Sequence, residues 1–281
     1  MSKGKARVNY LGGAGLVQSD TAPNIDFLYR ASTVKDPKWN LGDRVVLADG
    51  RVFRYGLCGY SLTDMKGACY SYNLLVTEKD AIAVAASVGD KYVDITFADT
   101  DGVDNDGVIA EDELRGGYIS FYRGTTRQQR GIIGNTARAN GDTSNTRVYL
   151  DASLVTAVNE DDDIEVLANP YSDLRGGAGG EAFGIWCSVM GMPNVLATTG
   201  QYFWIQTWGP FRISPTGAEL GVNQGERMFV FGGNGCVYSD RAYVDGGAPA
   251  NHSYQNAGPI IERTDGAAGS AAPFINLQIN P

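Results

Sequence analysis

Apolar and polar residues alternate over much of this chain, and the clearest case is Leu41–Tyr55. The alternation runs up to the turn residues 48–50, which include the Asp-Gly pair that favours tight hairpins, and resumes at Val52. Because successive side chains of a strand point to opposite faces, this pattern predicts two antiparallel strands joined by a short turn.

A second alternating stretch, Gln201–Pro210, is rich in aromatic residues. Tyr202, Trp204 and Trp208 share one face of the predicted strand. That face could be a platform on which sugars stack, although core packing or a subunit interface is the commoner use of such residues. Pro210 has no backbone N–H to donate, so we expect it to bar a central strand from continuing.

Many shorter runs have the same strand character, and turn residues separate them every ~8–12 residues. This spacing is typical of β-sandwiches and barrels rather than of alternating strands and helices. Residues 152–158 could form either a helical turn or an irregular edge. The other expected strands are residues 81–88, 91–97, 117–123, 132–133, 147–150, 164–167, 182–189, 211–214, 227–231, 235–239 and 274–279.

The runs fall into two groups, so we expect an all-β fold of two small sandwich-like or barrel-like domains, one inserted in the other. Residues 39–76 and 176–281 make up the hairpin-led domain, and residues 77–175 make up the inserted, barrel-like domain. The Gly-rich sequence RGGAGGE at 175–181 is the expected linker where the chain returns to the first domain.

Residues 1–38 show no sustained period, because Gly12–Gly15, Pro23 and Pro37 interrupt the pattern. This segment could be a loosely packed leader or an extended N-terminal arm that lies on a neighbouring subunit. We expect the arm, since the segment has too few periodic apolar residues to build a core of its own. Its expected contact residues are Tyr10, Leu11, Phe27 and Tyr29.

Composition and charge narrow the classes of function. The 281 residues are 43% hydrophobic, which is enough for a sizeable core. Asp and Glu number 32 against 23 Lys and Arg, and the net charge of −9 disfavours binding to a nucleic-acid backbone. The most apolar run, residues 81–88, is far shorter than the ~20 residues of a membrane span, and residues 10–17 are too Gly-rich for a secretory signal. We expect neither nucleic acid nor membrane as a partner, and assembly in the cytoplasm.

Residues 99–113 form an Asp-rich insert that partly matches a calcium loop. With Gly107 at the sixth position of the EF-hand pattern, Asp104, Asp106 and Glu113 occupy ligand positions, but Gly102 occupies the first. The alternative is an exposed acidic turn between two strands, because no helix pattern precedes the loop. These three carboxylates are the candidate Ca²⁺ site, and no organic cofactor is expected.

Residues suited to catalysis are sparse, so we expect no enzymatic activity. His252 is the single histidine, and no G-x-S-x-G nucleophile motif accompanies it. The acidic run Glu160–Asp163 is typical of a solvated turn. The cysteines have neither zinc-site nor disulfide-framework spacing, which predicts buried thiols. They are Cys58, Cys69, Cys187 and Cys236.

Several arginines make residues 115–147 locally basic. The planar guanidinium suits carboxylates at protein interfaces, whereas the plain alternative is a solvated rim. A nucleic-acid site is a distant third possibility because of the overall charge. The expected interface arginines are Arg123, Arg127, Arg130 and Arg138.

Five motifs in a fixed order carry a resemblance to a known family. They are Leu41–Tyr55 (LGDRVVLADGRVFRY), Gly116–Ile119 (GGYI), Leu167–Tyr171 (LANPY), Tyr202–Pro210 (YFWIQTWGP) and Pro273–Ile279 (PFINLQI). In these motifs the chain resembles the β-rich head decoration or cement proteins of tailed phages, which are encoded near the major capsid gene. The similarity extends from about Lys38 to the C-terminus.

The resemblance implies a virion structural protein that binds and stabilises the capsid. The implied partners are the major capsid protein and further copies of this chain, as a trimer, and the implied location is the capsid surface of the virion. The chain departs from the family in its long N-terminal segment, the insert at 99–113 and the loop at 238–253. The alternative function is a virion adhesion or carbohydrate-binding module that uses the 202–208 face or the 238–254 loop.

Overall fold

The computed structural model of the chain is all-β. Its described residues form 18 strands and one short 3₁₀ helix, and no described helix is long and apolar enough to cross a membrane. The structure describes residues 9–10, 25–62, 66–70, 74–78, 82–122, 127–160, 162–176, 188–213, 228–231, 235–239, 255–262 and 273–279.

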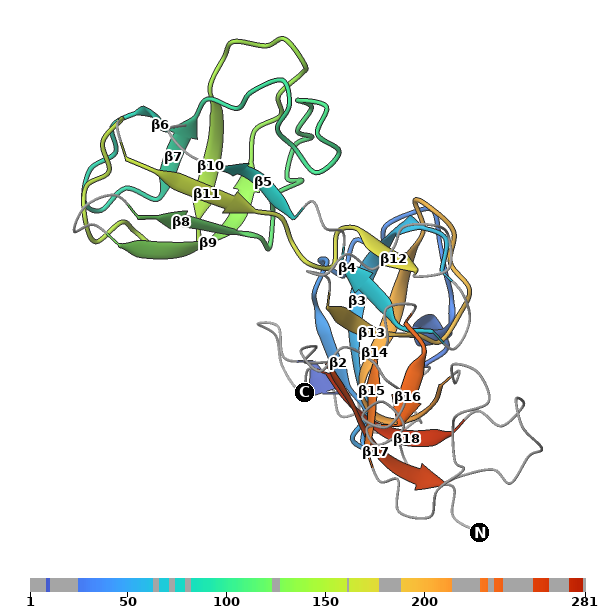
Figure 1. The fold of residues 1–281 in the computed structure, drawn as a ribbon. Helices are drawn as coiled ribbons and strands as arrows, with labels where there is room; N and C mark the ends of the chain where they lie inside the picture. Colours follow the sequence, from blue (N-terminus) through green and yellow to red (C-terminus); the bar gives the residue numbers. More distant parts are fainter. Residues whose placement is uncertain are drawn as a thin grey trace, which may run out of the picture. The chain divides into compact units, whose positions relative to one another are not determined.

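The chain divides into two compact units (Figure 1). Unit 1 comprises Met1–Ser71 and Tyr171–Pro281, and unit 2 comprises Tyr72–Pro170. The first boundary lies before the expected position at 77, because the strand β5 (Leu75–Glu78) pairs with a strand of unit 2. The second lies at Tyr171, whose carbonyl accepts a hydrogen bond of 2.9 Å from the Leu57 N–H in unit 1.

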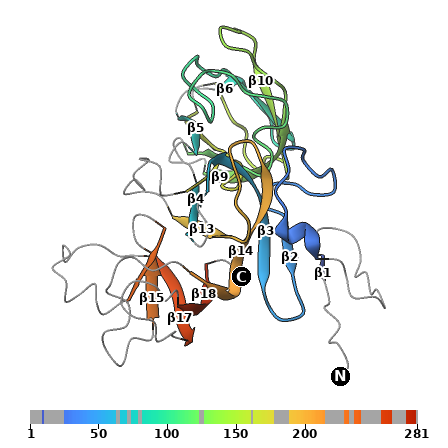
Figure 2. The same cartoon turned by 90° about the vertical axis from the view of Figure 1, so that its right-hand side faces the viewer.

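Unit 1 is built on an 11-stranded sheet with the order β1-β2-β3-β12-β4-β13-β14-β18-β17-β15-β16 and an additional β3–β14 pairing (Figure 2). All the pairs are antiparallel except β12 with β3. The elements of unit 1 are β1 (Asn9–Tyr10), η1 (Asp26–Tyr29), β2 (Arg44–Val46), β3 (Val52–Tyr60), β4 (Ala68–Tyr70), β12 (Leu174–Gly176), β13 (Val189–Pro193), β14 (Tyr202–Arg212), β15 (Met228–Phe231), β16 (Val237–Ser239), β17 (Asn256–Glu262) and β18 (Phe274–Gln278).

The hairpin predicted from Leu41–Tyr55 is confirmed as β2 and β3. The Leu47 N–H donates to the Arg51 carbonyl at 2.9 Å and closes the turn. Gly50 has φ of 86°, a left-handed conformation that glycine adopts without the steric cost of a side chain. The local sequence therefore fixes this turn without help from distant residues.

Pro210 does not end its strand, because β14 continues to Arg212, but the strand is no longer central among the described strands at this residue. The last pair between β14 and β3 is Trp208 with Val52, and Pro210 pairs with Asn276 of β18. At Pro210, β18 is therefore the only described strand that still pairs with β14. A residue without an N–H is tolerated there, since fewer ladder hydrogen bonds require a donor.

The aromatic face of β14 packs into unit 1. Trp204 is 2% exposed and contacts Trp39, Phe27 and Tyr55, with ring centroids 4.9, 5.7 and 5.1 Å from its own. Trp39 and Phe27 meet the Trp204 ring edge to face, which is a favourable arrangement of aromatic quadrupoles. Tyr202 and Trp208 are partly buried. The stretch that could have been a sugar platform is largely part of the core.

The described residues of the expected N-terminal arm are 9–10 and 25–38, and both segments contact their own unit rather than extending away from it: residues 9–10 pair with β2, and residues 25–38 pack beside β14. Leu28 is completely buried in the cluster that contains Trp204, and the backbone of Ser32 pairs with that of Tyr202. The packing could not be predicted from sequence periodicity, because it is made by the single 3₁₀ turn η1 and the one bridge residue Ser32. Residues 11–24 lie outside the described part of the chain.

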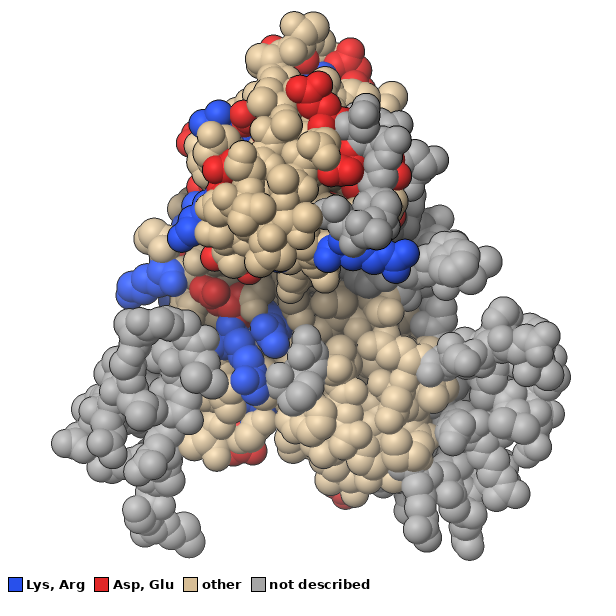
Figure 3. Space-filling model, turned by 90° about the vertical axis from the view of Figure 1, so that its left-hand side faces the viewer, with Lys and Arg blue, Asp and Glu red and all other residues tan. Residues whose placement is uncertain are grey.

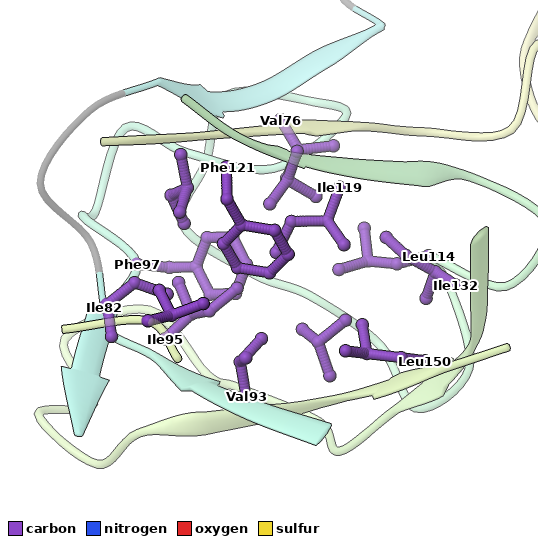
Figure 4. Packing of buried hydrophobic residues seen from close by; sticks show 14 of the residues in the cluster. Val76, Ile82, Val93, Ile95, Phe97, Leu114, Ile119, Phe121, Ile132 and Leu150 are labelled. Atoms are coloured by element: carbon purple, nitrogen blue, oxygen red, sulfur yellow. The ribbon is translucent and has the colours of Figure 1, made fainter. Parts of the chain in front are cut away.

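Unit 2 is a seven-stranded antiparallel sheet with the order β5-β11-β8-β9-β10-β7-β6 around one hydrophobic core (Figure 4). Phe121, Ile119, Leu150 and Ile95 point into this core and are at most 1% exposed. Residues 152–158 form an irregular edge whose Val158 pairs with Ala86. The remaining strands of unit 2 are β6 (Ile82–Val84), β7 (Tyr92–Ile95), β8 (Tyr118–Phe121), β9 (Gln128–Asn135), β10 (Thr146–Leu150) and β11 (Ile164–Leu167).

We predict that Trp204→Ala lowers the free energy of unfolding of unit 1 by about 3–5 kcal/mol, because it leaves a cavity among three aromatic neighbours. All four tryptophans, Trp39, Trp186, Trp204 and Trp208, lie in the sequence of unit 1, so tryptophan fluorescence in a urea titration follows that unit. Phe274→Ala on β18 is the matched control: Phe274 is 39% exposed, and its loss should cost less than about 1 kcal/mol. Equal effects of the two substitutions would contradict the central role of Trp204.

Candidate functional site

The Asp-rich loop of unit 2 is held together by its own carboxylates. The Val108 N–H donates to Asp106 Oδ1 at 3.0 Å, and the Ala110 N–H donates to Glu113 Oε2 at 2.6 Å. The loop also contains left-handed residues, Asn105 at φ of 55° and Gly107 at φ of 71°. The carboxylates of Asp106 and Glu113 therefore cap local turns of the loop.

Arg138 supplies a positive charge to this loop from inside the protein. Its side chain is 4% exposed, its Nη2 donates to Asp99 Oδ1 at 2.8 Å, and its Nη1 donates to the carbonyl of Gly107. The bond from Arg138 lowers the pKa of Asp99. Arg138 is thus not available as an interface residue, and the expectation that it makes contacts with a partner is wrong: it anchors the loop of its own chain.

The three candidate calcium ligands are close enough to influence one another. Burial raises the pKa of Glu113, and the negative charges of Asp104 and Asp106 raise it further. Within the described residues, however, no three His, Cys, Asp or Glu side chains are gathered in an arrangement that could hold a metal ion. The calcium site remains a prediction from the sequence. It can be tested by measuring whether calcium changes the melting temperature of unit 2.

We predict that Glu113→Gln raises the melting temperature of unit 2 at pH 7 in the presence of a chelator. A carboxyl group with a raised pKa in the folded state stabilises the fold below its unfolded pKa, and this stability is lost as pH rises through the folded pKa. Glutamine removes that loss, and its carbonyl oxygen can still accept the Ala110 N–H. Calorimetric melting from pH 4 to 7 measures the effect.

Glu111→Gln is the matched control, since Glu111 is an exposed carboxylate in the same loop. Repeating the melts with millimolar calcium tests the metal site. If calcium raises the melting temperature of the wild type and of Glu111→Gln but not of Glu113→Gln, the loop binds calcium. If Glu113→Gln melts lower than the wild type in chelator, the electrostatic argument is wrong.

The other expected interface residues differ in accessibility. Arg127 is exposed at the start of β9, whereas Arg130 is half-buried and donates to the Ser153 carbonyl at 2.8 and 3.1 Å. Tyr29 is 39% exposed and its hydroxyl accepts a bond of 2.8 Å from Arg51 Nη1. Phe27 stacks on Trp39 inside its own unit at a centroid distance of 5.9 Å, which limits its availability to a partner.

Some expected residues cannot be placed from the structure. Tyr10 pairs with Val45 as part of β1, but its side chain is outside the described part, as are Leu11, Arg123 and His252. Within the acidic run at 160–163, Asp162 is buried and accepts the Asn159 N–H at 2.8 Å. This bond is typical of an acidic turn.

One exposed arrangement on unit 2 was not singled out from the sequence. Tyr92 of β7 lies opposite Tyr149 of β10, and Asp94 lies opposite Arg147 on the same outer face. The alternation of residues 91–97 already placed Tyr92 and Asp94 on one face. Their partners were not identifiable, because the register between two strands more than 50 residues apart is a tertiary feature.

Cys58 lies on β3 and is completely buried. Its thiol lies 3.1 Å from the Tyr60 carbonyl, and burial raises its pKa to about 11. Cys236 is also buried. Both agree with the expected buried thiols, while the side chains of Cys69 and Cys187 lie outside the described part.

We predict that Cys58 resists alkylation in the native protein. At pH 8 its thiolate population is expected to be at least about 100-fold below that of an exposed cysteine, and alkylating reagents attack the thiolate. Peptide mass spectrometry after iodoacetamide treatment should find Cys58 unmodified in buffer and modified in guanidinium chloride. Rapid native modification of Cys58 would show that β3 opens or that the thiol is accessible.

On the face of the molecule shown in Figure 3, most of the acidic side chains lie in the upper part of the view, and several basic side chains lie near its middle. No protein-family model matches the chain, and neither does any curated protein or any solved structure at a significant level.

Proposed function

We propose that this protein is a non-enzymatic structural component of a tailed-phage virion that binds the assembled capsid as a decoration or cement protein. Its partners are the major capsid protein and further copies of itself. It stabilises the particle by burying surface across capsomer boundaries, where a standard interface buries on the order of 1,600 Å² in total.

The observation that supports this proposal is the strand pairing among the five motifs, which form one group of three and one group of two. The hairpin motif pairs with the aromatic motif through Tyr55 and Trp204, and the aromatic motif pairs with the C-terminal motif through Pro210 and Asn276. Motifs at opposite ends of the chain thus become neighbouring strands of one sheet. Such contact supports the interpretation that they are the shared scaffold of one family.

The remaining two motifs, Gly116–Ile119 and Leu167–Tyr171, also meet. Leu167 of β11 lies opposite Tyr118 of β8. Of the four expected interface arginines, Arg127, which directly precedes β9, is the described one that is exposed. An exposed guanidinium can bind a carboxylate or a carbonyl of a partner without first losing a partner of its own.

The alternative function, sugar binding by the 202–208 face, is less compatible with the geometry. Stacking on a sugar requires an accessible ring face, whereas Trp204 is 2% exposed and packed among other aromatic rings. The 238–254 loop is outside the described residues, apart from its first two positions.

The proposal predicts that particles of the encoding phage made without this protein lose DNA at a lower temperature than complete particles. Purified protein added back should restore the transition, and cryo-electron microscopy should show density repeated on the outer capsid lattice. The proposal would be contradicted if particles made without the protein kept their thermal stability. It would also be contradicted if purified wild-type virions did not contain the protein.

A pair of charge reversals tests the contact surface. Arg127→Glu should weaken binding to capsids by about tenfold or more, because it places a like charge against the partner's acceptor. Arg212→Glu is the control, since Arg212 is an exposed arginine on β14 of unit 1. If the two variants bind capsids equally in a sedimentation assay, Arg127 is not part of the interface. The proposed function is then tested by the add-back experiment alone.

A further inference from the structure

The outer face of β7 and β10 carries two cross-strand pairs, and a third pair of side chains follows directly beyond the ends of these strands. Tyr92 faces Tyr149, Asp94 faces Arg147, and Thr96 Oγ1 lies 3.3 Å from Asn145 Oδ1. Residues at alternate positions of a strand share a face, so the six side chains form one strip about 13 Å long. We name this strip the tyrosine–arginine ladder.

The centre of the ladder is rigid. Arg147 Nε and Nη2 donate to the two carboxylate oxygens of Asp94 at 2.8 and 3.0 Å, and the guanidinium lies 4.0 Å from the centroid of the Tyr92 ring. A bidentate pair that is also stacked on an aromatic ring holds the arginine in one conformation. A ligand therefore meets groups that are already ordered, which reduces the entropy lost on binding.

The ladder is also accessible. Tyr92 and Tyr149 are 39% and 40% exposed, and the side chain of Arg147 is 42% exposed. The two bonds to Asp94 use Nε and Nη2, so Nη1 can donate to an external acceptor. The strip thus offers an apolar ring surface next to a charged donor and, at its far end, the exposed amide of Asn145.

The order of the pairs favours a sugar over a protein surface. The buried centre of a protein interface is depleted of charged residues and is mainly apolar. Here the ion pair lies in the middle, between two aromatic rings and a hydroxyl–amide pair. A saccharide matches this order, because its C–H faces pack on tyrosine while its hydroxyls both donate and accept hydrogen bonds.

The balanced charge of the ladder indicates the class of sugar. Arg147 is neutralised by Asp94 at 2.8 Å, so the ladder has no unpaired charge with which to select an anionic ligand. We propose that the tyrosine–arginine ladder of unit 2 is a binding site for a short, neutral oligosaccharide, with Tyr149 as the stacking surface and Arg147 and Asp94 as hydrogen-bonding groups. This function is additional to capsid binding and does not depend on it.

The test uses the purified full-length chain on an array of neutral and sialylated oligosaccharides, followed by calorimetric titration with the best neutral binder. Tyr149→Ala should weaken binding by about tenfold or more, because the ring contact is lost. Tyr149→Phe should bind within a few-fold of the wild type, since it keeps the ring. Arg147→Gln should also weaken binding.

Tyr118→Ala is the matched control, because Tyr118 is 46% exposed on β8 and lies outside the ladder. It should bind like the wild type, and the melting temperatures of all variants establish that unit 2 remains folded. The proposal is overturned if no neutral oligosaccharide on the array binds, if only sialylated glycans bind, or if Tyr118→Ala weakens binding as much as Tyr149→Ala does.

Discussion

The pairing of β3 with β14, covered by Trp204, is the interaction on which unit 1 depends. It joins residues 52–57 to residues 202–208, so a loop of about 150 residues must close before the pair can form. The register runs from Tyr202 opposite Leu57 to Trp208 opposite Val52. Burial of Trp204 against Tyr55, its direct cross-strand neighbour, helps to offset the entropy of closing that loop.

Those parts of the fold that depend on neighbouring residues could be predicted from the sequence. The hairpin at 41–55 follows from alternation and an Asp-Gly turn, and both survive in the structure. The all-β class follows from many short runs separated by turn residues. The continuation of β14 through Pro210 could not be predicted in this way, because it depends on which strand lies beside the proline.

The packing of residues 25–38 is a second feature that could not be predicted from the sequence. Its single buried leucine, Leu28, gives no periodic signal, yet it fills a position beside Trp204. Arg138 is a comparable case at the candidate site: sequence reasoning grouped it with exposed arginines, but its partner Asp99 is 39 residues away in the chain. An ion pair between two loops produces no pattern in a single sequence. The burial of Arg138 and its pairing with Asp99 could therefore be found only from the tertiary structure.

Unit 2 is inserted into unit 1 at a single place in the chain order. The chain leaves unit 1 after β4 and returns at β12, and Tyr70 lies directly opposite Leu174 in the pairing of these two strands. Both connections to unit 2 therefore start from one place in the unit 1 sheet. Insertions between adjacent chain positions of this kind are tolerated because they leave the host core unchanged.

The same arrangement separates the physical constraints on the two units. Trp204 and its aromatic neighbours constrain residues 25–60 and 202–212, and none of the ladder residues Tyr92, Asp94, Arg147 and Tyr149 belongs to that cluster. Within unit 2, the ladder side chains point away from the core formed by Val93, Ile95 and Val148. Because strand alternation assigns the core to one set of positions and the outer face to the other, the ladder can change its chemistry while β7 and β10 keep the residues that fold them.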